Sequence, residues 1–365
     1  MHLANFVDKM SPKDQDEISA AFARAVYACN LPHSLFEHPL WKAAFSKIRP
    51  CFKPPNKNSV GGKLLTDEYD KIQAASKIKI DLANALSVGS DGWKNVRGEH
   101  LLNFVVCTPE PVFHSVVEPK TNREDHKYIA GEIKKVINDV GPMKTFLAVT
   151  DNAPVMVAAG HLIEEEFPHI THVGCCAHAL DLLIEDIVNL GTVSNIAKMC
   201  RALVKAVKNV PVNLSHFQLK QEEHSARTGK RSVSLKLPSP TRFAGVVILF
   251  HSVIANKEAL QQTVVIQDLA IDREIKDIAL SEDKFWSKRV AWHSVLQPIA
   301  RVLAYVESNY ATLSDAVEAF YVISVDSLQA FKSSPITKYR RKFEDCFEYR
   351  KSFVLKKRAL CREYS

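Results

Sequence analysis

The chain contains 365 residues, of which 46% are hydrophobic and 24% are charged, and its formal net charge is +7. This composition is that of a folded globular protein long enough for two domains, and it excludes a largely disordered chain. The most apolar stretch, "FAGVVILFHSVIA", is shorter than the roughly 20 residues that cross a bilayer, so we expect no membrane partner.

The first 85 residues are expected to form a small helical region. Apolar residues recur at helical spacing from residue 12 to 29, and Pro32 ends the pattern. After the Pro- and Gly-rich loop "CFKPPNKNSVGGK", the stretch "DEYDKIQAASKIKIDLANAL" predicts another helix. The N-terminus lacks the apolar core of a signal peptide, so we expect a reducing compartment and eight free cysteines.

Residues 86–190 have the pattern of an α/β region. Three short β-prone runs, "LSVGSDGW", "HLLNFVVCT" and "PVFHSVVEP", predict adjacent antiparallel strands. A helix, the strand "TFLAV", a helix from Pro154 to Phe167, the strand "HITHVGCC" and a strongly amphipathic helix are expected to follow. This succession predicts an α/β fold with a mixed sheet flanked by helices.

Residues 191–331 are expected to be all-helical. Helical periods recur at "VSNIAKMCRALVKAVKNV", "FAGVVILFHSVIANKEALQQTVV" and "PIARVLAYVESNYATLSDAVEAFYVI". The stretch "SARTGKRSVSLKLPSPT" between the first two is polar, so we expect a mobile linker there.

The remaining residues, 332–365, form a basic tail. It holds eleven Lys or Arg residues against four Asp or Glu residues, a net charge of +7 that equals the net charge of the whole chain. Cations interleaved with aromatic residues suit nucleic-acid phosphates or nuclear import, so we expect Arg340, Arg341 and Lys342 to bind DNA and the protein to be nuclear. An amphipathic helix that buries Phe343 and Phe347 under a solvated face is an equally good interpretation of the same residues.

Two aspartates lie at the ends of predicted strands. Asp91 lies at the end of the first strand and Asp151 at the end of the fourth. If these strands are neighbours, the two carboxylates meet and raise each other's pKa unless a cation lies between them, which predicts a site for Mg²⁺ or Mn²⁺. The alternative is structural, because Asp151 before Pro154 is typical of a helix N-cap and Asp91 before Gly92 is typical of a turn.

A run of histidines and cysteines invites comparison with a zinc site. Its members are His161, His169, His172, Cys175, Cys176 and His178. They lack the paired Cys-x-x-Cys spacing that makes a zinc prediction strong, so zinc is not expected as a cofactor. A hydrogen bond between His178 and Asp181 on one helix face, or cysteines buried as small core residues, explains the same run.

Three stretches taken together resemble the hAT superfamily of DNA transposases and the associated domain of unknown function. They are "SDGWKNVRGEHLLNFVV", "TDNAPVMVAAGHLIEEEFPHITHVGCCAHALDLLIEDI" and "PTRFAGVVILFHSVIANKEAL", and the resemblance covers about residues 5–330. It implies an RNase H-like fold with an all-helical insertion.

The resemblance also implies roles for particular residues. The first two catalytic acids and metal ligands would be Asp91 and Asp151, with Trp93 and Asn152 in the same motifs, and the Cys-x-x-His motif would be Cys175 and His178. The DNA-handling Arg and aromatic residue of the insertion would be Arg242 and Phe243, where the family more often has Trp.

The third catalytic acid of the family has no counterpart in this sequence. In the family a glutamate lies on a helix beyond the insertion, and nothing here resembles its Ser-Ser-Ala-x-x-Glu-Arg tract. We therefore expect a transposon-derived, nucleic-acid-associated protein that is truncated and catalytically incomplete, and a monomer or weak dimer. The alternatives are an active transposase that performs Mg²⁺-dependent DNA cleavage and strand transfer, and a zinc-stabilised protein-interaction module.

Overall fold

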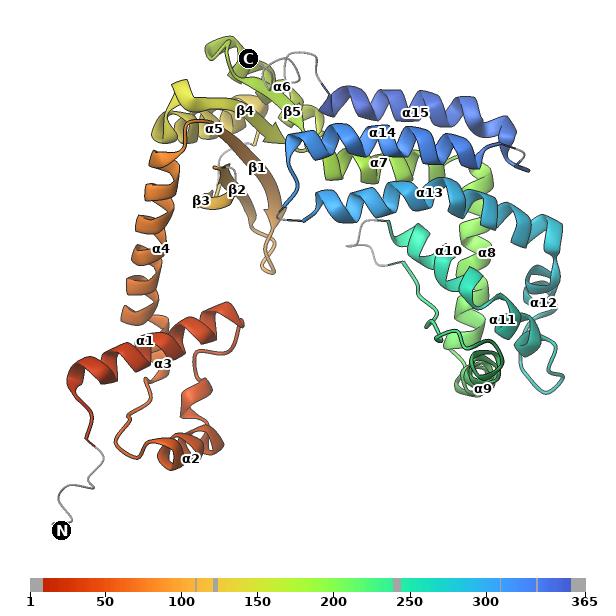
Figure 1. The fold of residues 1–365 in the computed structure, drawn as a ribbon, viewed down its shortest axis with the longest axis horizontal. Helices are drawn as coiled ribbons and strands as arrows, with labels where there is room; N and C mark the ends of the chain where they lie inside the picture. Colours follow the sequence, from red (N-terminus) through yellow and green to blue (C-terminus); the bar gives the residue numbers. More distant parts are fainter. Residues whose placement is uncertain are drawn as a thin grey trace. The chain divides into compact units, whose positions relative to one another are not determined.

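The fold is described from a computed structural model, for residues 9–108, 110–120, 124–238, 244–308, 310–332 and 334–355. The chain divides into two compact units (Figure 1). One comprises Met1–Asn84 with Val112–His114, and the other comprises Ala85–Pro111 with Ser115–Ser365. The predicted sites at Arg242 and Phe243 lie outside the described residues.

The first unit is helical apart from Val112–His114, which belong to a strand of the sheet described below. Its elements are α1 (Pro12–Ala28), η2 (Leu35–Glu37), α2 (Pro39–Ile48), α3 (Lys57–Gly61) and α4 (Lys63–Leu82). A small core of Val26, Phe36, Phe45, Phe52 and Val60 holds them together. The ring of Phe22 contacts three of these aromatic rings, with centroid distances of 4.9–5.8 Å.

The second unit is built around a five-stranded mixed sheet. Its strands are β1 (Leu86–Lys94), β2 (His100–Cys107), β3 (Pro111–Val117), β4 (Thr145–Thr150) and β5 (Thr171–Gly174), in the order β3-β2-β1-β4-β5. β1 is antiparallel to β2 and parallel to β4, and β4 is parallel to β5. Together with its flanking helices this is the RNase H-like α/β arrangement that was predicted, which confirms the fold class.

The two faces of the sheet differ in burial. Side chains alternate between faces along a strand, so Val88, Leu102, Phe104 and Ala148 fall on one face, where they are fully buried. Two helices, α5 (His126–Val140) and α6 (Pro154–Glu166), pack against each other and against strands of the sheet, with η3 (Pro142–Lys144) before β4. The opposite face is only partly buried, and it carries Asp91.

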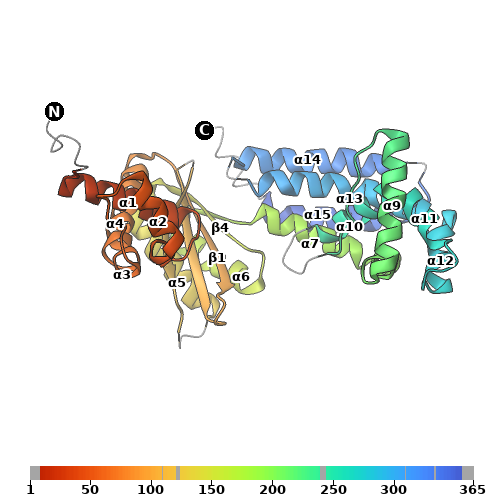
Figure 2. The same ribbon diagram turned by 90° about the horizontal axis from the view of Figure 1, so that it is seen from below.

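Beyond β5 the regular elements of the described residues are all helices. Its elements are α7 (Cys176–Val188), α8 (Gly191–Lys208), α9 (Pro211–Thr228), α10 (Gly245–Ala255), α11 (Lys257–Val264), α12 (Arg273–Leu280), the π-helical turn η4 (Glu282–Trp286), α13 (Ser287–Val306), α14 (Leu313–Ala330), η5 (Thr337–Tyr339) and α15 (Arg340–Val354). Helices α7, α13, α14 and α15 run alongside one another (Figure 1 and Figure 2). One apolar core joins them, with Trp286, Trp292 and Phe320 fully buried in it.

The described part of the basic tail is the helix α15, which packs against α7. Phe343 is 0% exposed and Phe347 is 4% exposed. The amphipathic-helix interpretation of these two residues is therefore confirmed, because both belong to the helical core while Arg340, Arg341 and Lys342 are exposed.

The polar linker expected after α9 is not a free segment in its described part. Leu235 is only 3% exposed and belongs to the helical core, and the carbonyl of Val233 accepts hydrogen bonds from Gln221 and Asn256. Residues 229–238 are thus hydrogen-bonded to α9 and to Asn256 between α10 and α11, while their mobility stays a prediction.

Two further observations concern the described residues only. The seven cysteines among them are free thiols. No helix in these ranges is long and apolar enough to cross a membrane.

Candidate functional site

The register of the central strands brings Asp91 and Asp151 to the same edge of the sheet. In the parallel pair of β1 and β4, Gly89 lies opposite Val149. Asp91 comes two residues after Gly89, and Asp151 comes two residues after Val149, directly after the end of β4. The carboxyl ends of parallel strands share one edge, where α/β proteins commonly bind ligands. The structure therefore places the two predicted acids side by side.

Asp91 is not a turn residue. It lies within β1, opposite Asn103 of β2, and that pairing continues to Lys94 and His100. The tight turn comes later, where the amide of Gly98 donates to the carbonyl of Asn95 at 2.9 Å. The turn interpretation of Asp91 is wrong, because cross-strand pairing extends the strand past Gly92.

Asp151 is not the N-cap of the following helix. Ala153 occupies the N-cap position of α6, with Pro154 as the first helical residue. The Asp151 carboxylate instead accepts the Ala153 amide with Oδ1 at 2.8 Å. That amide is the one hydrogen-bond donor to this carboxylate among the described residues, so Oδ2 stays available to a ligand.

Both carboxylates line one cavity of about 530 Å³, which Cys175 and His178 also line. The pKa of Asp91 is raised, first by partial desolvation and then by the negative charge of Asp151. The Gly92 amide and the His178 ring oppose that rise. Asp91 remains accessible to solvent at the cavity mouth, so its carboxylate can still meet a ligand.

A hard divalent cation fits this donor set. Two carboxylates converge on one cavity, and the pKa of Asp91 is raised by the nearby charge of Asp151, which a cation would compensate. Mg²⁺ is usually held by one or two carboxylates, with water and substrate phosphate filling its other positions. No group of three or more His, Cys, Asp or Glu side chains in the described residues is placed to hold a metal ion.

Cys175 joins the start of α7 to the end of β4, just before Asp151. Its amide donates to the carbonyl of Thr150 at 2.6 Å, which fixes the start of α7 beside the end of β4. Burial raises the pKa of the Cys175 thiol, the amides of His178 and Ala177 oppose the rise, and the charges of Asp91 and Asp151 add to it. Cys175 is therefore a neutral thiol at physiological pH, which suits a packing role better than a nucleophilic one.

The expected hydrogen bond between His178 and Asp181 is absent from the described residues. Asp181 accepts the amide of Ala244 at 3.3 Å instead. His178 lies in the first turn of α7, where it lines the cavity and lowers the pKa of Asp91. The pairing prediction is wrong because Asp181 caps the chain entering α10 and His178 is directed to the carboxylates.

Asn152 and Trp93 flank the cavity in different ways. The Asn152 Nδ2 donates to the carbonyl of Cys175 at 3.4 Å, and its buried Oδ1 has no partner among the described groups. A Cβ on Gly174 would lie 1.8 Å from that Oδ1, so only glycine permits this close approach. Trp93 is 51% exposed and lies on the same face of β1 as Asp91.

The other members of the histidine and cysteine run have separate partners. His172 Nε2 lies 2.9 Å from Thr150 Oγ1, and His169 Nε2 lies 2.8 Å from the Pro142 carbonyl. His161 lies 3.9 Å from Glu164 on the outer surface of α6. Burial raises the pKa of Cys176 to about 12. These side chains do not converge on one point.

The cationic residues predicted to bind DNA lie at the start of α15. Arg340, Arg341 and Lys342 are exposed, and Arg340 pairs with Glu344 at 3.0 Å. None of the three is among the residues that line the carboxylate cavity. Their role in DNA binding stays a prediction.

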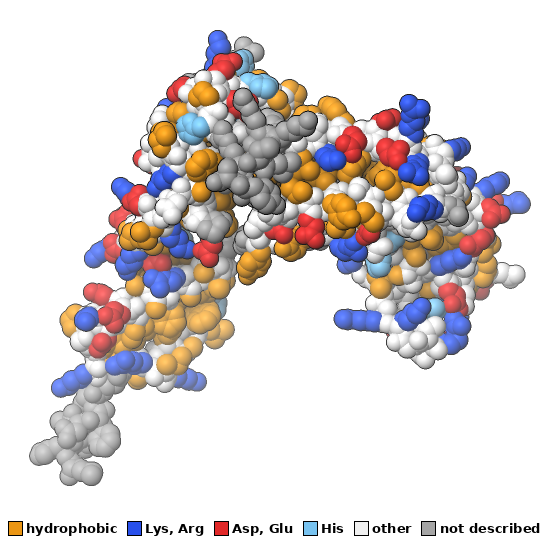
Figure 3. All heavy atoms as spheres, turned by 45° about the horizontal axis from the view of Figure 1, so that its top comes forward, with side chains coloured by type: hydrophobic (Ala, Val, Ile, Leu, Met, Phe, Trp, Pro, Cys, Tyr) orange, Lys and Arg blue, Asp and Glu red, His pale blue; other side chains and the backbone are white. Residues whose placement is uncertain are grey.

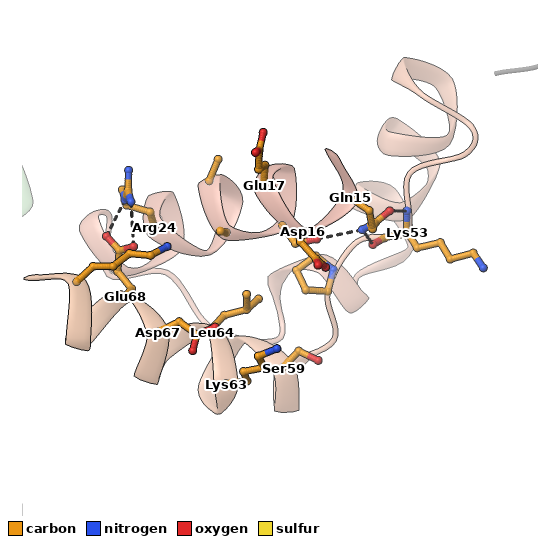
Figure 4. A pocket seen from close by; sticks show the side chains of 15 residues that line it. Gln15, Asp16, Glu17, Arg24, Lys53, Ser59, Lys63, Leu64, Asp67 and Glu68 are labelled. Atoms are coloured by element: carbon orange, nitrogen blue, oxygen red, sulfur yellow. Dashed lines mark hydrogen bonds and ion pairs between the residues drawn. The ribbon is translucent and has the colours of Figure 1, made fainter. Parts of the chain in front are cut away.

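The N-terminal unit contains a second hollow, of about 600 Å³, between α1 and α4 (Figure 4). Arg24 donates to both oxygens of Glu68 across it, at 2.6 and 3.0 Å. Its other charged residues, Asp16, Glu17, Asp67, Lys53, Lys63 and Lys71, are equally divided between the two signs. This hollow has no charge preference that would select a ligand.

The sequence interpretation missed one cavity residue, Asn103. It is the single polar residue inside the apolar run "LLNFVV" of β2, and it lies opposite Asp91. A lone polar residue within a buried strand was the available signal, and only the register identifies its neighbour.

Comparison with known families places the cavity in a recognised domain. Residues 55–203 match the family described as Domain of unknown function (DUF659). This domain is found in hAT-family transposase-like proteins. The match contains the whole sheet and the four cavity residues Asp91, Asp151, Cys175 and His178. A comparison with curated proteins finds no match.

Proposed function

We propose that this chain is a transposon-derived, hAT transposase-like protein that binds nucleic acid in the nucleus and holds Mg²⁺ or Mn²⁺ on Asp91 and Asp151. One observation supports this most strongly. Asp91 on β1 and Asp151 directly after the neighbouring parallel strand β4 line one cavity, and the pKa of Asp91 is raised first by desolvation and then by the charge of Asp151. Two carboxylates gathered in this way are costly to the fold and suited to a divalent cation.

The residues of the site have distinct tasks in this proposal. Asp91 and Asp151 supply the anionic oxygens, and the Ala153 amide orients the Asp151 carboxylate. Asn152 and Cys175 hold the end of β4 beside the start of α7. A bound divalent cation would polarise a phosphodiester and position its oxygens.

We further propose that the site binds phosphate without cleaving it. In-line phosphodiester transfer requires the attacking and the leaving oxygens to be stabilised together, which two-metal sites achieve with more carboxylates than two. The described residues offer Asp91 and Asp151 and no third acid in the cavity. The expected product is a bound complex rather than a cut strand.

The test combines metal binding with a DNA assay. Mn²⁺ binding is measured by electron paramagnetic resonance on the wild type and on Asp91→Asn, Asp151→Asn and the control Asp277→Asn, which alters an exposed acid on α12. We expect one bound Mn²⁺ per chain, with at least a tenfold loss of affinity in the two site variants only.

Divalent-dependent nicking of a DNA hairpin is measured in parallel. We expect no cleavage by the wild type. Nicking that disappears in Asp151→Asn would establish an active transposase and contradict the binding-only proposal. Equal Mn²⁺ binding by all four proteins would refute the metal site itself.

A further inference from the structure

A third cavity, distinct from the carboxylate cavity and from the hollow in the N-terminal unit, lies between α9, α10 and the segment after α9. Residues 229–238 are held across this space by their backbone. Gln221 and Asn256 donate to the Val233 carbonyl at 2.8 and 2.7 Å, and the Lys236 amide donates to Ser252 Oγ at 3.1 Å. Asn256 is 4% exposed, so this anchor is buried. The segment therefore forms one wall of the cavity.

This wall presents unpaired cations. The cavity has a volume of about 680 Å³, and Lys230 and Arg231 line it together with His224 from α9 and His251 from α10. Neither the Lys230 ammonium nor the Arg231 guanidinium has a partner among the described residues. Lys and Arg side chains project around α9 at the lower right of Figure 3.

The acid at the cavity does not neutralise these cations. Glu258 is the one acidic residue among the described residues that line it. Its carboxylate already accepts hydrogen bonds from Arg227 and from His224, the latter at 3.0 Å. Lys257 is likewise engaged, with Glu282 at 2.6 Å. The charges left without partners at this cavity are positive.

One buried cation, Arg289, lies close to the histidine pair at this cavity. The His251 ring stacks on His293, with the centroids 5.7 Å apart, and His293 is 9% exposed. Arg289, one helical turn from His293, is fully buried and stacks on Trp286 at 3.8 Å. Its guanidinium nitrogens have no carboxylate among the described residues as a hydrogen-bond partner, and the Cys200 thiol is the hydrogen-bonding group beside them. A buried cation raises the electrostatic potential of its surroundings.

We propose that this cavity is a phosphate-binding site. Its free groups are donors and cations, so the ligand must supply anionic oxygens, and a guanidinium beside an ammonium suits the several oxygens of a phosphate. The volume is that of a nucleotide site and is far larger than a single carboxylate needs. The phosphate belongs either to a free nucleotide or to a nucleic-acid strand, and the inference does not depend on the carboxylate cavity.

The experiment measures the binding of pyrophosphate, ATP and a ten-residue oligothymidylate by isothermal titration calorimetry. The proteins are the wild type, Lys230→Gln, Arg231→Gln and the control Arg273→Gln, which removes an exposed cation from α12. We expect affinity to fall about tenfold or more in each cavity variant and to stay unchanged in the control. All three substituted side chains are exposed, so circular dichroism should show an unaltered fold.

The ligands distinguish the two sources of phosphate. Tighter binding of ATP than of the oligonucleotide assigns the site to free nucleotides. Tighter binding of the oligonucleotide, with affinity that falls steeply between 50 and 200 mM salt, assigns it to a strand. Affinities that are equal in wild type and cavity variants, or no binding of any probe, would overturn the proposal. The titrations are run in EDTA, so that no divalent cation on Asp91 and Asp151 contributes to binding, which separates the two sites.

Discussion

Arg350 on α15 donates two hydrogen bonds to the carboxylate of Asp186 on α7, at 2.7 and 2.8 Å, although 164 residues separate the two in sequence. Their side chains are 15% and 27% exposed. A paired guanidinium and carboxylate in this partly shielded position is stronger than an exposed ion pair. The pair therefore joins the last described helix to the helix that leaves the sheet.

The strength of this pair can be measured in a double-mutant cycle. Arg350→Met, Asp186→Asn and the double variant should give a coupling free energy of about 1–2 kcal/mol in urea unfolding. The same cycle on Lys351 and Glu348, an exposed pair on α15 alone, should give about 0–0.5 kcal/mol. Equal coupling in both cycles would show that partial burial adds nothing.

Asp91→Asn should raise the melting temperature of the metal-free protein at neutral pH. The folded-state pKa of Asp91 is raised by desolvation and by Asp151, so ionisation favours the unfolded state and stability falls as pH rises through that pKa. Differential scanning fluorimetry in EDTA at pH 5 and pH 7.5 measures the effect, which should be larger at pH 7.5. Added Mn²⁺ should then stabilise the wild type and not the variant. A variant less stable than wild type in EDTA would contradict this account.

Acid should destabilise the helical region through His293. Burial, followed by the charges of His251 and Arg289, lowers the pKa of His293 to about 4, from an ordinary value of 6.5. The unfolded chain therefore binds the extra proton between pH 6.5 and 4, and the unfolding free energy falls over this window by at most about 3 kcal/mol. Urea unfolding at pH 5 and pH 7.5 measures this loss. His293→Gln should reduce the pH dependence, and His161→Gln, at an exposed position, should not.

Gly174→Ala should destabilise the protein by about 1–3 kcal/mol, because the new methyl group would lie 1.8 Å from Asn152 Oδ1 and 3.2 Å from the Phe353 carbonyl. Gly131→Ala in α5 is the matched control. Nothing lies within 4 Å of its added Cβ, so this change should be neutral or stabilising by up to about 1 kcal/mol. Thermal unfolding compares the two, and a tolerated Gly174→Ala would mean that the loops around Asn152 can separate.

The sequence predicts the elements of this fold well because their apolar periods are regular. It predicts the surroundings of the two acids less well. Asp91 before Gly92 has the local composition of a turn, and only pairing with β2 makes it a strand residue. Asp151 resembles a cap, yet Pro154 begins the helix and Ala153 takes the cap position. In each case a partner distant in sequence decides the conformation.

The sequence also failed to predict the conformation of the segment after α9, residues 229–238. Its composition is largely polar, and its three apolar residues before Pro238, Val233, Leu235 and Leu237, are too few to predict a packed element. Its conformation depends on Gln221 and Asn256, which precede and follow it in the sequence. No local pattern reveals that these amides meet at one carbonyl, so the cavity they support could not be predicted.

The junction of α7 and α15 has a consequence for synthesis on the ribosome. At roughly 5–20 residues per second, about 10–30 s pass between the translation of Asp186 and that of Arg350. During this interval α15 has not yet been synthesised. We therefore expect the nascent chain to expose an apolar surface of α7 that α15 covers in the folded protein.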